Sequence, residues 1–236
     1  MDNKKKRKIY LIISIITGCI FGCGILGFIY IWFNMRQGTD TIISFEQFIP
    51  LFFIAILCGG IFQVFYNRYK RLNSGLQGEE KSQNVLSKLP SSYQILSNIS
   101  ISHEGQKGEI DNLILSPRGI VIVESKNYGG NISGNEQDKE WTQTKTSNKG
   151  NVYTNTIKNP VKQVNRQVYI LSQILKENGI RCWIDGYVFM AGGQCMTDSN
   201  KVYTDERLLL QTIMTSGKDG ALSDNDMNKI KQILSK

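Results

Sequence analysis

The residues best suited to chemistry are two carboxylates and a lysine in neighbouring predicted strands. Glu124 and Lys126 directly follow the apolar run at residues 120–123, and Asp111 lies in the segment before it. Because side chains alternate along a strand, Glu124 and Lys126 share one face. Two carboxylates can hold Mg²⁺ or Mn²⁺, and a lysine beside them can orient water or stabilise charge on a phosphate. The set predicts metal-assisted phosphodiester hydrolysis, although a Glu-x-Lys pair is also typical of a solvated ion pair.

The turn between the two strands decides how close the carboxylates come. With a two-residue loop, Ser116 pairs with Gly119 and Asp111 lies opposite Glu124, with Cβ atoms about 4.5–5.5 Å apart. A three-residue loop with a bulge at Gly119 places Asp111 opposite Ser125 instead. The hydrophobic pattern fits both registers. In the first register the like charges repel, and a divalent cation would relieve that repulsion.

The elements around these residues alternate between helices and strands, which predicts a sheet flanked by helices and an α/β fold. Asn159-Pro160 is a typical helix start, and the spacing of Ser223 to Asp226 resembles a capping box. The patterns predict a helix over 74–88, strands over 93–102, 109–115, 119–126, 130–134 and 183–191, a polar connecting segment to about 156, a helix over 160–178, and short helices after 204 and 223.

Two apolar stretches near the N-terminus predict membrane spans. Residues 9–33 carry no charge, and residues 48–66 contain only Gln63 as a strongly polar side chain. At about 1.5 Å per residue both can cross a hydrocarbon core of roughly 30 Å. A cleaved signal peptide is the alternative for residues 1–33, but this apolar stretch exceeds the usual length and a second one follows. Small residues in the first span also offer a surface for self-association: Gly18, Gly22, Cys23, Gly24 and Gly27.

The basic residues predict the orientation of these spans. Five of them, residues 4–8, precede the first span, and Arg68, Lys70 and Arg71 follow the second, whereas the connection 34–47 holds only Arg36. The positive-inside rule then places both termini in the cytoplasm. We therefore expect a multi-pass protein of the cell membrane whose N-terminus and C-terminal domain are cytoplasmic.

The charge and the histidine count exclude several classes of function. Residues 1–71 hold nine basic and three acidic residues, and the remaining 165 hold 19 and 17, so the net charge of +8 divides into +6 and +2. The high isoelectric point is therefore weak evidence that the larger part binds nucleic acid. The single histidine, His103, argues against His-dependent hydrolases and zinc sites. A modest basic series remains near the predicted site: Lys145, Lys149, Lys158, Lys162 and Arg166.

Several short motifs resemble the NERD (nuclease-related) domain, within the PD-(D/E)xK restriction-endonuclease-like class. They are Gly75-Leu-Gln-Gly78-Glu79, Gly108-Glu-Ile-Asp111, the run from Gly119 to Asn127, Trp141, Asn159-Pro160 and Gln163. The resemblance implies a restriction-endonuclease-like mixed sheet flanked by helices. It implies metal ligands at Asp111, Glu124 and Glu79. It implies catalytic roles for these three, for Lys126 and for Gln163, which lies on a helix that faces the site. Ile110 replaces the proline of the class name.

These observations together predict a membrane-anchored, Mg²⁺- or Mn²⁺-dependent nuclease that acts on DNA or RNA at the cytoplasmic face. The alternative is a catalytically inactive module that binds nucleic acid, or a protein partner through residues 135–156, at the membrane. The expected organisation is a basic N-terminus (1–8), two spans (9–33 and 48–66) joined by an external loop (34–47), a linker (67–73), a nuclease-like domain (74–192) and a C-terminal extension that packs on it (193–236).

Overall fold

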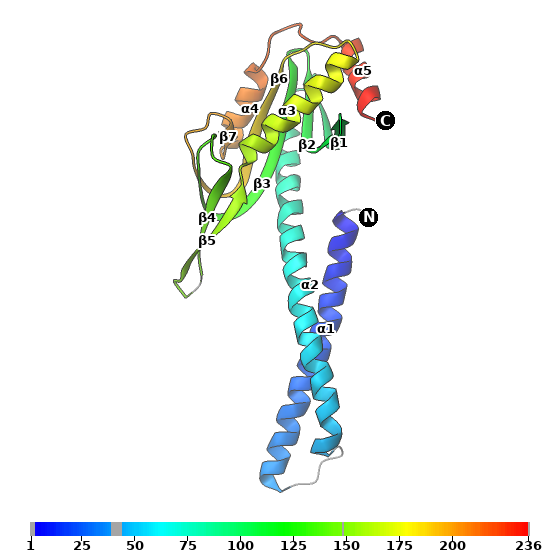
Figure 1. The fold of residues 1–236 in the computed structure, drawn as a ribbon, viewed down its shortest axis with the longest axis vertical. Helices are drawn as coiled ribbons and strands as arrows, with labels where there is room; N and C mark the ends of the chain where they lie inside the picture. Colours follow the sequence, from blue (N-terminus) through cyan, green and yellow to red (C-terminus); the bar gives the residue numbers. More distant parts are fainter. Residues whose placement is uncertain (1–2, 39–43, 148, 236) are drawn as a thin grey trace. The chain divides into compact units, whose positions relative to one another are not determined.

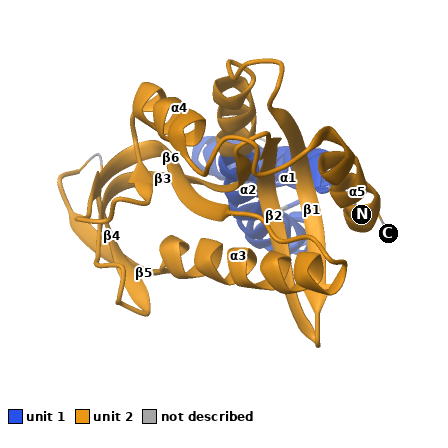
Figure 2. Cartoon of the chain, turned by 90° about the horizontal axis from the view of Figure 1, so that it is seen from above, with its two compact units in different colours: residues 1–76 blue, residues 77–236 orange. Residues whose placement is uncertain are grey.

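The computed structural model describes residues 3–38, 44–147 and 149–235. The chain forms two compact units, Met1–Leu76 and Gln77–Lys236, which Figure 2 distinguishes by colour. The division falls inside a long helix, so that residues 77–86 of this helix belong to the second unit.

Two helices make up the first unit. Helix α1 spans Asn3–Gln37, and helix α2 spans Phe45–Leu86 and continues into the second unit (Figure 1). Both are long and apolar enough to cross a membrane. This confirms that the chain carries two apolar helices where the spans are predicted. Part of the expected external loop, residues 39–43, lies outside the described residues.

Glycines allow α1 and α2 to pack closely. A Cβ atom added to Gly24 would lie 2.2 Å from the Cβ atom of Ala55, and one added to Gly27 would lie 2.9 Å from the ring of Phe48. Such distances require glycine or a shift of the neighbour. These two glycines therefore pack within the chain, whereas Gly22 has no described atom within 4 Å of its added Cβ position. Self-association through α1 stays a prediction.

Helix α2 is continuous where a linker and a new helix were expected. Residues 67–73 are helical, and the helix expected over 74–88 is the last part of α2. The segment 67–73 contains neither proline nor glycine, and its arginine, lysine and leucine residues favour a helix. Nothing in the local sequence therefore ends the helix before Leu86, four residues before Pro90.

The second unit contains a seven-stranded mixed sheet. Five strands follow one another in sequence order as antiparallel neighbours, while β6 pairs in parallel with both β3 and β7. The arrangement confirms the predicted α/β fold with helices flanking a mixed sheet. The bounds are β1 Gln94–His103, β2 Gln106–Ser116, β3 Gly119–Ser133, β4 Glu140–Thr146, β5 Val152–Lys158, β6 Ile184–Met196, β7 Val202–Tyr203, α3 Pro160–Glu177, α4 Glu206–Thr215 and α5 Asp224–Leu234.

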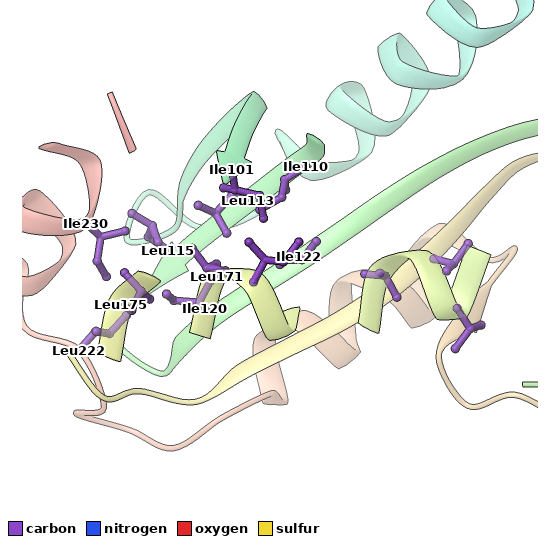
Figure 3. Close-up of a cluster of buried hydrophobic side chains, with 14 of the residues drawn as sticks. Ile101, Ile110, Leu113, Leu115, Ile120, Ile122, Leu171, Leu175, Leu222 and Ile230 are labelled. Carbon is purple, nitrogen blue, oxygen red and sulfur yellow. The ribbon is translucent and has the colours of Figure 1, made fainter. Parts of the chain in front are cut away.

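Apolar side chains are buried on both faces of this sheet. Helices α3 and α5 cover one face, where Ile120 and Ile122 of β3 meet Leu171 of α3 (Figure 3). The end of α2 and helix α4 cover the other face, where Val121 of β3 packs among residues such as Leu209. Figure 2 shows α3 and α4 on opposite sides of the sheet. Strand β3 is therefore central and buried on both faces, as its continuous apolar run predicts.

The sequence-based prediction missed one hairpin. Strands β4 and β5 occupy most of the segment expected to be an irregular connection. Their pairing sets Thr142 opposite Thr156 and Thr144 opposite Thr154, and β-branched residues favour strands. All of β5 except Ile157 is exposed, so the strand lacks the buried apolar face that the periodicity argument requires.

Two glycines of α2 should respond in opposite ways to alanine. A Cβ atom at Gly78 would lie 2.6 Å from the Cβ atom of Asn127 in β3, whereas one at Gly75 has no described atom within 4 Å. Gly78→Ala should therefore lower the free energy of unfolding by about 1–3 kcal/mol. Gly75→Ala should raise it by roughly 0.5–1 kcal/mol, because alanine favours the helix. Chemical denaturation of the two variants in detergent would measure both effects, and equal shifts would contradict the close approach.

Candidate active site

A two-residue turn sets the register of the strands that carry the candidate residues. Ser116 pairs with Gly119 across Pro117 and Arg118, and the ladder continues to Asn112 opposite Val123. The structure therefore selects the first of the two predicted registers. Gly119 adopts a φ of +135°, and an added Cβ would lie 2.8 Å from the carbonyl oxygen of Trp183. Both features require glycine at this position.

Asp111 lies where the ladder between β2 and β3 ends. Its Oδ2 accepts the backbone N–H of Ser125 at 2.8 Å, so a side chain replaces the backbone acceptor that a continued ladder would supply. On the other edge of β2, Asn98 of β1 has a φ of +56°, between residues that pair regularly. Strand β2 is thus irregular at Asp111, and its carboxylate is turned toward β3 next to Glu124.

Glu124 is the most deeply buried carboxylate in this region. The residue is 1% exposed. Its Oε1 accepts the ammonium of Lys126 at 2.6 Å and the amide of Gln163 at 2.7 Å, and its Oε2 accepts the amide of Gln167 at 2.7 Å. A buried carboxylate is costly unless it is paired and hydrogen-bonded, and here three donors satisfy it. The alternative of a solvated surface ion pair is therefore wrong for Glu124 and Lys126.

The two glutamines reach Glu124 because Asn159 fixes the start of α3. Its side-chain oxygen accepts the N–H of Val161 at 2.9 Å and that of Lys162 at 3.3 Å. Its amide donates to three carbonyl oxygens in the connection between β3 and β4, those of residues 135, 136 and 138. Gln163 and Gln167 follow at a spacing of four residues, so both face the sheet on the same side of the helix.

The electrostatics of the site centre on Asp111 and Lys126. Burial, followed by the negative charge of Glu124, raises the pKa of Asp111 to about 7, and Glu79 adds to this in the same direction. The Ser125 N–H and the charge of Lys126 oppose the rise. Burial alone would lower the pKa of Lys126, but the neighbouring Glu124 carboxylate outweighs it and raises that pKa above its usual value. Lys126 is therefore a cation at neutral pH.

The donor set fits a hard divalent cation with two carboxylates. Asp111 and Glu124 are brought together, and the influence of Glu79 on the pKa of Asp111 places it in the same electrostatic environment. No group of three or more metal-ligating side chains is assembled in the part of the chain that the structure describes, and the role of Glu79 as a third ligand stays a prediction. Mg²⁺ is often held by one or two carboxylates while it keeps several waters, so Asp111 and Glu124 offer the type and number of ligands that it needs.

Gln167 is a second glutamine of α3 that supports Glu124. It is 2% exposed, and its amide also donates to the carbonyl oxygen of Glu109 at 2.7 Å. Since both neighbours are acceptors, the nitrogen must face them, and its Oε1 has no partner among the described residues. The available signal was its position one turn after Gln163. His103, in contrast, contacts Glu177 at the surface and takes no part in this set.

A polar network under the site was also not predicted. The amide of Asn112, a residue 1% exposed, donates to the hydroxyl oxygens of Ser82 and Ser125, each at 3.3 Å. The hydroxyl of Ser97 donates to the side-chain oxygen Oδ1 of Asn112 at 3.1 Å. The network joins residues 77–86 of α2 to the strands that carry Asp111 and Glu124. Ser82 lies 30 residues before Asn112, so no local pattern reveals the contact.

The mixed sheet, its flanking helices and the buried carboxylate–lysine pair define an α/β domain with a polar site on its central strand. Residues 74–191, which are half of the chain, match the nuclease-related domain, NERD, and the chain belongs to this family. It is also 41% identical over 71 residues to an uncharacterized protein of Bacillus anthracis, a match that covers 29% of this chain and 34% of that protein. The chain thus spans about a third of this curated relative. No solved structure matches it.

Replacement of Asp111 by asparagine should change how stability depends on pH. The folded state raises the pKa of Asp111 from 3.8 to about 7, so its carboxyl group favours the folded state at low pH and costs stability as pH rises through this interval. With chelator present, Asp111→Asn should raise the free energy of unfolding by about 1–3 kcal/mol at pH 8 and change it little at pH 4. Chemical denaturation across pH tests this, with the exposed Asp198→Asn as control. A less stable Asp111→Asn variant at pH 8 would contradict a destabilising effect of the ionised Asp111 carboxylate.

Loss of the Gln167 amide should destabilise the domain. Gln167→Leu removes a donor from the buried Glu124 carboxylate and should lower the free energy of unfolding by about 1.5–3 kcal/mol. Gln173→Leu is the matched control on the same helix, because its amide contacts only the neighbouring Ser172, at 3.5 Å. Thermal unfolding compares the two. Equal midpoints would mean that Gln167 does not support Glu124.

Proposed function

We propose that this protein is a membrane-anchored, metal-dependent nuclease that hydrolyses phosphodiester bonds in DNA or RNA. The observation that carries the proposal is the buried Glu124 carboxylate, which three protein donors hold beside Asp111 and Lys126. Membership of the nuclease-related family supports it. A domain that needed only stability would gain from apolar residues at these positions, because buried ion pairs contribute little net stability.

Asp111 and Glu124 would hold Mg²⁺ or Mn²⁺, and Glu79 would supply a further carboxylate near Asp111. When bound, the metal would polarise the phosphate and lower the pKa of water. The Ser125 N–H occupies Oδ2 of Asp111, which leaves Oδ1 as the oxygen available to a cation among the described contacts. Binding of a cation would also keep Asp111 ionised, since its charge would offset the burial and the repulsion from Glu124 that raise the pKa of Asp111.

The other polar residues would act on charge and orientation. Lys126 stays protonated, so its ammonium would stabilise the negative charge that develops on the phosphate oxygens during attack. Gln163 and Gln167 donate to both oxygens of Glu124 and would fix the orientation of its carboxylate without neutralising it. In the proposed reaction these two glutamines would act through Glu124, so they are positioning residues.

The apolar helices would anchor the protein in the cell membrane. The basic residues 4–8 before the first apolar stretch, and Arg68, Lys70 and Arg71 after the second, favour a cytoplasmic location for both ends of the hairpin. Helix α2 leads directly into the nuclease-related domain at residues 74–191. The substrate would therefore be nucleic acid that reaches the cytoplasmic face of the membrane.

An inactive binding module is the second candidate. Both oxygens of Glu124 already accept hydrogen bonds from protein groups. In the described part of the chain, Asp111, Glu124 and Glu79 do not form a group of three metal ligands. Such a site would bind nucleic acid without cleaving it. Metal-dependent cleavage separates the two candidates.

The decisive experiment incubates the full chain in detergent with labelled single- and double-stranded DNA and RNA, and with Mg²⁺, Mn²⁺ or chelator. Cleavage should require the metal and should fall by at least about 10²-fold in Lys126→Ala and in Asp111→Asn. Asp111→Asn matters because it should remain folded. Lys176→Ala, on the exposed part of α3, is the control that should retain activity.

Cleavage that persists in Lys126→Ala and Asp111→Asn would reject this site as the catalytic one. Binding without cleavage of any of the four substrates would instead favour the inactive module.

A further inference from the structure

A basic groove lies beside the candidate active site. It has a volume of about 540 Å³. It lies between the start of β2, the start of β4, the end of β5 and residues 162–170 of α3. Its basic residues come from three places in the sequence: Lys107, Lys139 and Lys158, and Lys162 with Arg166 on α3. The basic series noted in the sequence contributes three of these five residues. Lys145 and Lys149 do not line the groove.

The charge of this groove differs from that of the surrounding domain. Five cations face two carboxylates, Glu109 and Glu140, which gives a formal charge of +3. The 165 residues from 72 onward carry a net charge of only +2, so the remainder of that segment is slightly acidic. All five basic residues are exposed, and none forms an ion pair within the described residues. The Lys162 ammonium donates to the carbonyl oxygen of Gln137 at 2.6 Å, a neutral acceptor that leaves its charge uncompensated. Positive charge is therefore concentrated in the groove.

Two glutamines link the groove to Glu124. Gln163 and Gln167 line it, and both donate to the Glu124 carboxylate at 2.7 Å. The Oε1 atom of the buried Gln167 has no hydrogen-bond partner among the described residues. An unpaired acceptor of this kind calls for a donor from water or from a ligand. The groove thus lies next to the two glutamines that hold the carboxylate proposed to act on the phosphodiester.

We propose that this groove binds a single strand of nucleic acid next to the bond that is cut, an inference that rests on the proposed nuclease function. Lys107 stands on one wall and Lys139 and Lys158 on another, so cations would contact one strand from both sides. Lys162 and Arg166 are four residues apart and form neighbouring contacts along α3. A recess of this volume, with charge on its walls, suits one backbone better than a duplex, whose phosphates lie on a wide outer surface.

The test measures binding by the full chain in detergent with chelator present, so that cleavage plays no part. A fluorescent single-stranded 12-mer is titrated against wild type and the double variant Lys162→Ala/Arg166→Ala. For two lost phosphate contacts, affinity should fall roughly 25-fold at about 0.1 M salt, and the slope of log K against log salt should become less negative by about 1.4. The charge-matched control is Lys176→Ala/Arg181→Ala, two exposed basic residues outside the groove, which should bind as wild type does.

Several results would overturn the proposal. Equal losses in both double variants would mean that only overall charge matters. Tighter binding of a duplex 12-mer with the same dependence on Lys162 and Arg166 would reject the single strand. Failure of wild type to bind, or displacement of the 12-mer by phosphatidylserine vesicles from wild type but not from the groove variant, would reject nucleic acid as the occupant. Because the assay excludes metal, a groove-dependent loss of binding would stand even if no cleavage were found.

Discussion

The burial of one negative charge organises this domain. Glu124 sits at 1% exposure on the central strand, where an unpaired carboxylate would cost several kcal/mol. Three donors compensate for it, and they come from two elements: Lys126 lies on β3 itself, and Gln163 and Gln167 lie on α3. The turn that sets the β2–β3 register adds a second carboxylate, Asp111, to the same region. The unfavourable proximity of these charges is what suits the site to a cation.

The features that follow from local rules were predictable from the sequence. The start of α3 at Asn159-Pro160 and the capping box from Ser223 to Asp226 both appear as expected, because these caps depend on residues two or three apart. The central position of β3 follows from its continuous apolar run. The site residues Asp111, Glu124, Lys126 and Gln163 are brought together, whereas their roles in catalysis stay predictions.

Other features depend on contacts that no local pattern records. Strand β5 has no buried residue, and the two buried residues of β4 are Trp141 and the polar Gln143, so apolar alternation marks neither strand. The bond from Gln167 to Glu124 joins residues 43 positions apart, and the register of β2 against β3 was open because both options satisfied the same apolar pattern. The continuity of α2 through residues 67–73 was missed because the membrane argument assigned a boundary where the backbone has no reason to break.

Asn159 couples the local unfolding of two segments of the domain. Its single side chain caps α3 and also holds three carbonyl groups of the connection between β3 and β4, some 21–24 residues earlier in the chain. Neither segment can keep its full set of hydrogen bonds if the other leaves. The helix and the connection should therefore behave as one cooperative unit in local unfolding, and the basic groove and the support of Glu124 would form and dissolve together.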